Sequence, residues 1–212
     1  MKIQQLAEFC QLLKKDVNHL FKYMTNKLIK KRKFQIGVMG SAADTKYTKK
    51  IELIAEKIGM ILAEKKCVTV YGAEKDFDSL STAAARGAKK AGGMTVGVTY
   101  GKGKDIWDKE GNTDVIICSG LERGGGREFV LVNSCDGIIA VSGGSGTMNE
   151  MLVAYQLNIP IVVVTGTGGW ADKMAGNYFD SRKRTKAVPA KTAEEAVEKI
   201  LKLVKNNEKS RK

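Results

Sequence analysis

The 212-residue sequence predicts an α/β protein with a Rossmann-like, doubly wound and mostly parallel sheet of about six to seven strands. Short apolar segments alternate with segments of helical periodicity along residues 34–205. Several of the short segments are apolar throughout, which is typical of parallel strands covered on both faces. Glycine-rich loops follow them, and ligands bind such sheets at the carboxyl ends of the strands.

A basic, amphipathic helical extension is predicted before the domain, over residues 1–33. Leu6, Phe9 and Leu13 begin a series of apolar residues that recur at steps of three and four between residues 4 and 30. This apolar stripe must bury against the domain or against a second subunit. We therefore expect a homodimer or a higher homo-oligomer.

The nucleotide-binding domain is predicted over residues 34–205, and its last helix begins with a capping box at Thr192 and Glu195. A basic tail follows over residues 206–212. The segments predicted as strands are residues 34–39, 68–71, 94–99, 114–118, 137–141 and 159–165, and those predicted as helices between them are residues 47–63, 79–91, 127–135 and 146–157.

Composition excludes several classes of protein. No run of 18 apolar residues exists, so no membrane association is expected, and the first residues lack an apolar signal core, which predicts a cytoplasmic protein. The four cysteines form no Cys-x-x-Cys pair, and His19 is the only histidine. A metal site and a Ser-His-Asp triad are therefore not expected.

The net charge of +13 is concentrated at the two ends of the chain. Residues 1–33 and residues 182–212 each carry +7, whereas the middle of the chain carries −1. Such ends could bind a nucleic acid through its phosphates. The alternative is that lysine-rich helix faces are simply solvated surface.

The most informative loop joins the fifth predicted strand to the next helix. Glycines let the backbone approach an anion closely, and the first N–H groups of the helix point toward that anion. Hydroxyls at two positions add further donors. We expect this loop, rather than a simple tight turn, to bind a phosphate through Gly143, Gly144, Ser145, Gly146 and Thr147.

Two charged residues accompany this loop. Glu150 lies three residues after Thr147 and faces the mouth of the expected site, although it could instead merely complement the helix dipole. Arg127 follows a glycine run at a helix start and could hold a phosphate or a carboxylate in a fork, or else lie on the surface.

Three further loops lie at the same predicted edge of the sheet. Gly40 and Ser41 follow the first strand and Gly72 follows the second, so they are expected to contribute to nucleotide binding. The glycine-rich segment 165–169 could act as a mobile lid with Trp170 stacked on a base, or Trp170 could pack in the core. No dinucleotide fingerprint and no P-loop occurs, so neither an NAD-dependent dehydrogenase nor an ATPase is proposed.

These features together resemble the Lonely Guy (LOG) family, once called lysine-decarboxylase-like. Its motif Pro-Gly-Gly-x-Gly-Thr-x-x-Glu corresponds to residues 142–150, and its arginine nine residues before an aspartate corresponds to Arg127 and Asp136. The resemblance covers residues 34–203 and looks closest to the branch that includes molybdenum-cofactor carrier proteins. LOG enzymes cleave a nucleoside 5′-monophosphate to free base and ribose 5-phosphate, without a cofactor.

The resemblance implies roles for the matching residues, and four departures qualify it. Arg127 and Glu150 would be the catalytic pair, and residues 143–147 would hold the 5′-phosphate. Ser142 replaces the motif proline, Ala73 follows Gly72 where a second glycine is usual, and Ser79 stands where a helix usually begins with glycine. Glu128 follows Arg127 where the hydrolases have lysine and the carrier branch has asparagine. The expected function is a phosphoribohydrolase, with a non-catalytic carrier or sensor of a phosphorylated cofactor as the alternative.

Overall fold

The computed structural model describes residues 16–17, 32–108, 110–122 and 125–210, and it divides the chain into two units, 1–33 and 34–212. In the first unit, Asp16 and Val17 are helical. The rest of the helix predicted over residues 4–30 lies outside the described residues.

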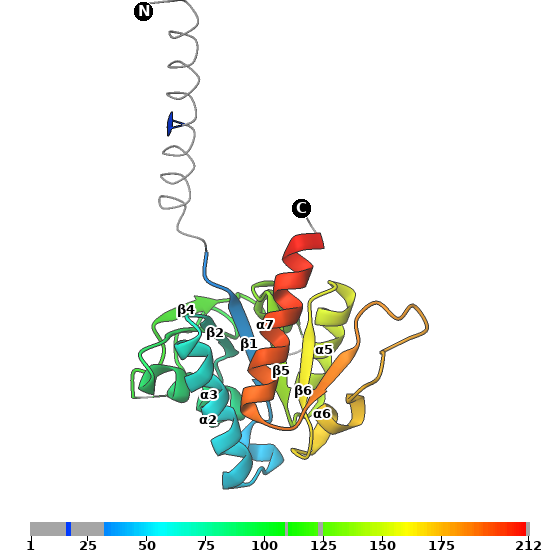
Figure 1. The fold of residues 1–212 in the computed structure, drawn as a ribbon. Helices are drawn as coiled ribbons and strands as arrows, with labels where there is room; N and C mark the ends of the chain where they lie inside the picture. The colour runs from blue at the N-terminus through cyan, green and yellow to red at the C-terminus, as the bar shows by residue number, and fades with distance from the viewer. Residues whose placement is uncertain (1–15, 18–31, 109, 123–124, 211–212) are drawn as a thin grey trace, which may run out of the picture. The chain divides into compact units, whose positions relative to one another are not determined.

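The second unit contains one sheet of seven parallel strands in the order β4-β3-β2-β1-β5-β6-β7 (Figure 1). This arrangement confirms the predicted Rossmann-like fold. The chain steps outward from β1 to β4 and then returns to β5 beside β1, so the strand order reverses between β1 and β5. The strands are β1 Gln35–Gly40, β2 Val68–Gly72, β3 Met94–Thr99, β4 Val115–Cys118, β5 Gly137–Val141, β6 Ile161–Val164 and β7 Ala187–Ala190.

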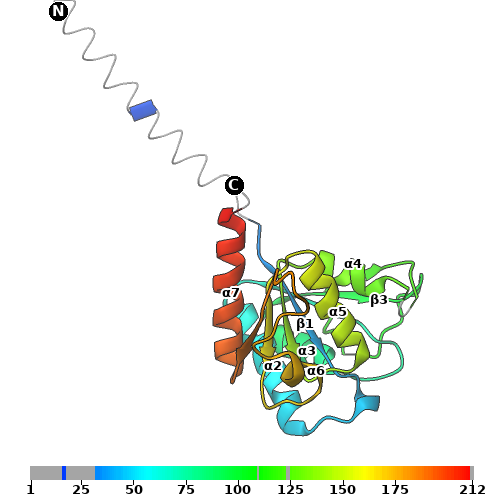
Figure 2. The same cartoon turned by 90° about the vertical axis from the view of Figure 1, so that its right-hand side faces the viewer.

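Helices cover both faces of the sheet (Figure 2). Every residue of β2, β5 and β6 is buried, as their apolar composition predicted. One face carries α2 Lys49–Glu64, α3 Leu80–Lys90 and α7 Ala193–Ser210, and the other carries α4 Arg127–Asn133, α5 Ser145–Gln156 and α6 Gly169–Met174. A short 3-10 helix, η1 Ala43–Thr45, follows β1.

Hydroxyl side chains begin three of the helices. The Thr48 and Ser79 hydroxyls accept from N–H groups in the first turns of α2 and α3. At α7, the Glu195 N–H donates to Thr192 Oγ1 over 3.2 Å, as predicted. The Glu195 carboxylate reaches back to the N–H of Lys191, one residue before the position expected for a capping box.

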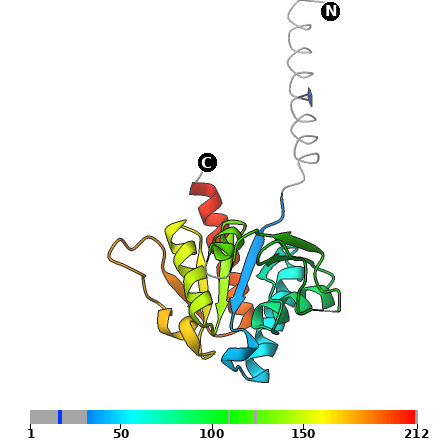
Figure 3. The ribbon, with the colours of Figure 1, turned by 180° about the vertical axis from the view of Figure 1, so that it is seen from behind.

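The structure differs from the element predictions near the C-terminal edge of the sheet (Figure 3). β7 was not identified in the sequence because it has four residues and contains Pro189, which an edge strand tolerates. α7 extends to Ser210, beyond the predicted end at residue 205. In the part of the chain that the structure describes, no helix is long and apolar enough to cross a membrane.

Candidate functional site

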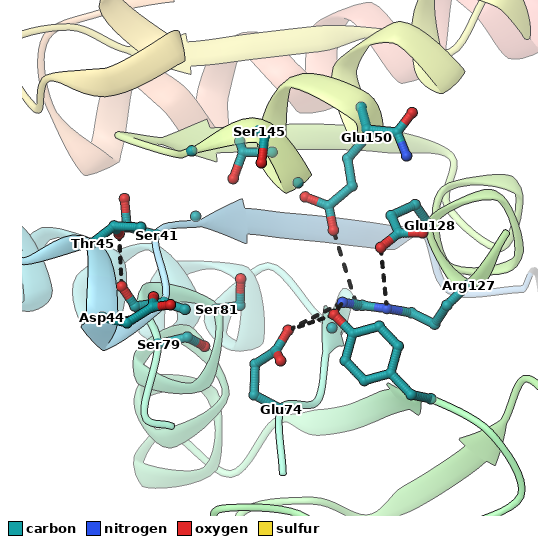
Figure 4. Close-up of a pocket in the computed structure, with 18 residues that line it drawn as sticks. Ser41, Asp44, Thr45, Glu74, Ser79, Ser81, Arg127, Glu128, Ser145 and Glu150 are labelled. Carbon is teal, nitrogen blue, oxygen red and sulfur yellow. Dashed lines mark hydrogen bonds and ion pairs between the residues drawn. The ribbon is translucent and has the colours of Figure 1, made fainter. Parts of the chain in front are cut away.

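A cleft of about 380 Å³ opens where β1 and β5 end, at the point where the strand order reverses (Figure 4). In this fold such a crevice is the expected place for a ligand. The loop after β5 and the start of α5 border one side, and residues after β2 and β3 and at the start of α4 border the other. Nine of the ten predicted site residues line it, namely Gly40, Ser41, Gly72, Arg127, Gly144, Ser145, Gly146, Thr147 and Glu150.

The loop between β5 and α5 has a conformation that its sequence explains. Ser142 has φ +56°, and its N–H donates to Thr167 Oγ1 over 2.8 Å. Proline fixes φ near −65° and has no N–H, so it could not occupy this position. Gly143 has φ +104°, and a Cβ there would lie 2.5 Å from the Thr147 side chain. Gly143 therefore shapes the loop and does not line the cleft.

The loops after β1 and β5 are joined by hydrogen bonds. Ser41 Oγ accepts from the Gly143 N–H over 2.9 Å and donates to Ser142 Oγ over 3.2 Å. Gly40 is required for packing, because a Cβ there would lie 2.7 Å from Leu80 Cβ. These contacts fix the floor of the cleft across the β1–β5 junction.

The segment after β6 supports the same loop from outside the cleft. The N–H groups of Trp170 and Ala171 donate to the carbonyls of Gly143 and Ser142, over 3.0 and 2.9 Å. Trp170 packs against the core on the α5 and α6 side and does not line the cleft. This placement agrees with the core alternative for Trp170 and not with a lid that stacks on a base.

Helix α5 directs the N–H groups of its first turn toward the cleft. The first hydrogen bond of the helix runs from the Met148 N–H to the Gly144 carbonyl, over 3.1 Å. The N–H groups of Ser145, Gly146 and Thr147 precede it and so have no acceptor within the helix. Together with the positive end of the helix dipole, they form an anion-binding surface.

Arg127 is the centre of the opposite wall. It is only 3% exposed, and its Nη2 donates to Glu74 Oε1 over 3.1 Å and to the Tyr100 hydroxyl. Its guanidinium carbon lies 4.1 Å from the centre of the Tyr100 ring, and that hydroxyl donates to Glu74 Oε1 over 3.0 Å. Burial opposes the charge on Arg127, but Glu150, Tyr100 and Glu74 outweigh it and hold its pKa above the ordinary value.

Two more carboxyl groups flank the same guanidinium. Glu150 Oε1 lies 4.0 Å from Arg127 Nη1, and Glu128 Oε1 lies 3.9 Å from Arg127 Nε. Both distances are too long for hydrogen bonds. Burial raises the pKa of Glu150 to about 8; Arg127 opposes the rise, whereas Glu128 and Glu74 add to it. Glu150 is therefore mainly protonated at neutral pH.

Gly72 makes room for this arrangement. A Cβ at that position would lie 1.9 Å from Arg127 Nη1 and 3.0 Å from the guanidinium carbon. Any side chain there would displace the guanidinium group. Gly72 was predicted to contact a nucleotide, and in the structure it leaves the space that the Arg127 guanidinium occupies.

The sequence did not identify most of the cleft residues that surround Arg127, nor those at the start of α3. Glu74 and Tyr100 follow strands β2 and β3, so their position after a strand was the available signal, but neither belongs to a motif. Glu128 was noted only as a departure. The lining residues not predicted as site residues are Ala42, Asp44, Thr45, Glu74, Ser79, Ser81, Tyr100, Glu128 and Asn149.

One protein-family model matches most of the chain and shows its family. Residues 33–197 match the model of the SLOG cluster4 family. The chain belongs to the SLOG cluster4 family. This SLOG protein is also 33% identical over 122 residues to an uncharacterized protein of Archaeoglobus fulgidus, an alignment that covers 58% of this chain and 74% of that one.

Solved structures similar to this SLOG protein include a carrier protein and a binding protein for the molybdenum cofactor. The molybdenum cofactor carrier protein of Chlamydomonas reinhardtii is 29% identical with a TM-score of 0.68, over 82% of this chain and 99% of that one. The molybdenum cofactor binding protein of the phototrophic bacterium Rippkaea orientalis is 26% identical with a TM-score of 0.67, over 82% of this chain and 98% of that one. Both agree with the resemblance deduced from the sequence.

Proposed function

We propose that this SLOG protein binds a nucleoside 5′-monophosphate and hydrolyses its N-glycosidic bond, releasing the free base and ribose 5-phosphate. One observation carries the proposal: an anion-binding helix start and a buried Arg127–Glu150 pair line the same cleft. The first can hold the phosphate, and the second provides charge and a proton where a glycosidic bond would break.

The phosphate is assigned to the start of α5. The N–H groups of residues 145–147 and the hydroxyls of Ser145 and Thr147 supply donors, and no acidic side chain occurs in the first turn of this helix. Ser41, Ser79 and Ser81 lie across from Ser145 at this end (Figure 4). The Ser41 hydroxyl already donates to Ser142 Oγ and the Ser79 hydroxyl bonds Thr82, so Ser81 adds the further hydroxyl donor. We name this region, formed by the five residues 41, 79, 81, 145 and 147, the phosphate end.

The glycosidic bond is assigned to the opposite wall. Breaking it develops positive charge on the ribose and leaves an electron pair on the base. The carboxylates of Glu74 and Glu128 favour the positive charge, while Arg127 favours the negative charge on the departing base. We name this group, Glu74, Tyr100, Arg127, Glu128 and Glu150, the charged wall.

Glu150 supplies the proton in this mechanism. As the bond between C1′ and the base nitrogen breaks, the protonated carboxyl donates its proton to the base. Water adds its oxygen to C1′, and the proton that this water loses returns to the Glu150 carboxylate. The carboxyl group is thus restored, and the chain needs neither a histidine nor a cofactor.

A carrier of a phosphorylated cofactor is the second candidate. The similarity to two molybdenum cofactor binding or carrier proteins, over 82% of this chain, favours it. A carrier would use the same phosphate end but would release its ligand unchanged.

One experiment separates the two candidates. Purified protein and a Glu150→Ala variant are incubated with AMP, GMP, CMP, UMP and IMP, and free base is followed by chromatography. Base released by the wild type and not by the variant supports the hydrolase. Nucleotide binding by calorimetry without any base release would instead support the carrier.

A further inference from the structure

Helices α2 and α7 pack side by side on one face of the sheet and leave an open groove of about 610 Å³ between them. The groove lies on the face away from α4, α5 and α6. It is lined by three apolar and six charged residues, namely Ile61, Val197, Leu201, Lys57, Lys65, Lys202, Lys205, Glu194 and Glu198. None of these nine belongs to the phosphate end or to the charged wall, so the proposed reaction does not use this surface.

The groove offers accessible apolar surface along its length. Ile61 and Val197 form a buried floor, and Leu201 is partly exposed beside them. The lysines at the rim add methylene stems, which can lie along an apolar partner while their ammonium groups stay in water. On α2, the stripe that holds Ile61 continues through Lys57 to Leu53, which is 53% exposed. A partner that follows the two helices would therefore meet apolar surface over about two turns.

The charged residues of the groove are unevenly distributed. Lys57 and Glu194 lie opposite each other near the start of α7, with Nζ 4.0 Å from Oε1. Toward the C-terminal ends of both helices, the charged lining residues are Lys65, Lys202 and Lys205. None of these three lysines has an ion-pair partner in the part of the chain that the structure describes. The C-terminal end of α7 extends past the strands, so this basic end of the groove is open to a partner (Figure 1).

We propose that this groove docks an amphipathic helix of another protein, with apolar residues on Leu201 and acidic residues against Lys65, Lys202 and Lys205. The walls are two helices whose backbone groups are hydrogen-bonded internally, so they offer no partners to the backbone of an extended peptide. A helix satisfies its own backbone, and its side-chain ridge fits the groove between two packed helices. Its apolar residues would recur at steps of three and four along the face that meets the groove.

The charge of the surface decides the kind of partner. Four lysines and two glutamates line the groove, which gives the lining a formal charge of +2, and the whole chain carries +13. An acidic protein is therefore attracted to this surface, whereas a second copy of the chain is repelled on balance. A nucleic acid could use the lysines, but it would leave Leu201 and Leu53 in water and bring its phosphates against Glu194 and Glu198.

The probe is a synthetic, fluorescently labelled peptide of about 18 residues, long enough to follow both walls as a helix. Leucines recur along one face, and glutamates flank them. Two control peptides have the same composition in scrambled order, or lysine in place of glutamate. Fluorescence anisotropy measures their binding to the full-length protein. We expect the acidic amphipathic peptide to bind about tenfold more tightly than either control, as two or three ion pairs would give. Equal binding of the three peptides, or binding of none, would overturn the inference.

A charge-reversed variant locates the binding. Lys202→Glu combined with Lys205→Glu changes two exposed side chains of the groove, and Lys50→Glu combined with Lys102→Glu changes two exposed lysines outside it as the matched control. We expect the first variant to lose about tenfold in affinity for the acidic peptide and to prefer the lysine peptide, whereas the control keeps the wild-type order.

Two outcomes would overturn the inference at this step. An unchanged preference in the charge-reversed variant would place the peptide elsewhere on the protein. Tighter binding of a DNA duplex than of the acidic peptide, lost in the same variant, would assign the surface to nucleic acid. Base release is expected to be the same in both variants, because neither changes a residue of the cleft, so this test is independent of the proposed function.

Discussion

The phosphate end and the charged wall face each other across one cleft, but they are built differently. The loop between β5 and α5 holds its own shape, because hydrogen bonds from Ser41, Thr167 and the start of α6 satisfy its polar groups. The charged wall instead buries three polar atoms without a partner and surrounds one arginine with three carboxyl groups.

This difference teaches what each side needs from a ligand. The phosphate end keeps its shape without a ligand, and its five residues offer N–H and hydroxyl groups to a phosphate, although the Asp44 carboxylate also lines this end of the cleft. The charged wall surrounds one buried arginine with three carboxyl groups, so it can favour a change in the charge of a group beside it. Substitutions at the first should therefore alter affinity for all phosphates, and substitutions at the second should alter turnover and base preference.

The largest expected effect comes from removing the ionisable group of Glu150. In the Glu150→Gln variant the shape remains, but no proton can be given to the departing base. We expect kcat for base release to fall about a thousandfold, as for the loss of a general acid. The measurement is free base by chromatography, and thermal unfolding checks that the variant is folded. A fall of less than about tenfold would exclude Glu150 as the proton donor.

A smaller effect is expected when Arg127 is moved rather than removed. The Gly72→Ala change places a methyl group where Nη1 lies, so the guanidinium must shift. A shift on the order of 1 Å in a catalytic group can cost about a hundredfold, and we expect that loss in kcat. Ribose 5-phosphate should still bind as before. Gly103→Ala is the matched control, because a Cβ there meets nothing within 4 Å.

Unchanged turnover in the Gly72→Ala variant would show that the position of Arg127 does not limit the reaction. Equal losses of turnover and ribose 5-phosphate binding would point to a general collapse of the cleft. Either result would remove the distinction between the two sides.

The pH dependence of stability provides a third test. Glu150 remains protonated in the folded protein up to about pH 8, because burial raises its pKa, but in the unfolded chain it ionises near the ordinary pKa of 4.5. Unfolding therefore releases a proton between these values, and rising pH favours unfolding there. We expect the wild-type free energy of unfolding, relative to Glu150→Gln, to fall by about 1.4 kcal/mol per pH unit within this window.

Denaturant titrations of both proteins from pH 4 to pH 9 would measure this difference. It should level off below the ordinary pKa of the carboxyl and again above the raised one. Parallel stability curves for the two proteins would mean that Glu150 ionises normally in the folded protein. In that case it could not serve as a proton donor at neutral pH.

The smallest effect is expected at the support of the β5–α5 loop. The Thr167→Val change removes the hydroxyl that accepts from the Ser142 N–H, leaving that group buried and unpaired. We expect about 1–2 kcal/mol of lost stability and a similar loss of affinity for every phosphate ligand. Thr167→Ser keeps the hydroxyl and should restore both. A change in base preference would contradict the separation of roles.

The sequence predicted the two sides unequally, for a physical reason. The β5–α5 loop is made of neighbouring residues whose types are dictated by backbone conformation, as at Gly143, so a local pattern reveals it. The sheet was predictable because β5 and β6 are apolar throughout and β2 has one polar residue, Thr69, among apolar ones. β7 was not predicted because it has only four residues and contains Pro189, so its sequence gives a weak strand signal.

The charged wall was only half predictable because tertiary packing assembles it. Arg127 and Glu150 were singled out by their places beside glycine-rich loops, and the family resemblance implied their catalytic role. Glu74 and Tyr100 instead reach Arg127 from 53 and 27 residues away in the sequence. No spacing rule connects such positions. The burial that changes the charge state of Glu150 is likewise a property of the folded chain.

The central claim is that the phosphate end binds the ligand and the charged wall carries out the reaction. The most direct test measures both the binding and the turnover of GMP. Wild type and Glu150→Gln are titrated with GMP, and guanine and ribose 5-phosphate are quantified from the same samples. The account predicts equal amounts of the two products from the wild type, almost none from the variant, and GMP affinities within about threefold of each other. Binding without product in the wild type, or equal product from both proteins, would contradict it.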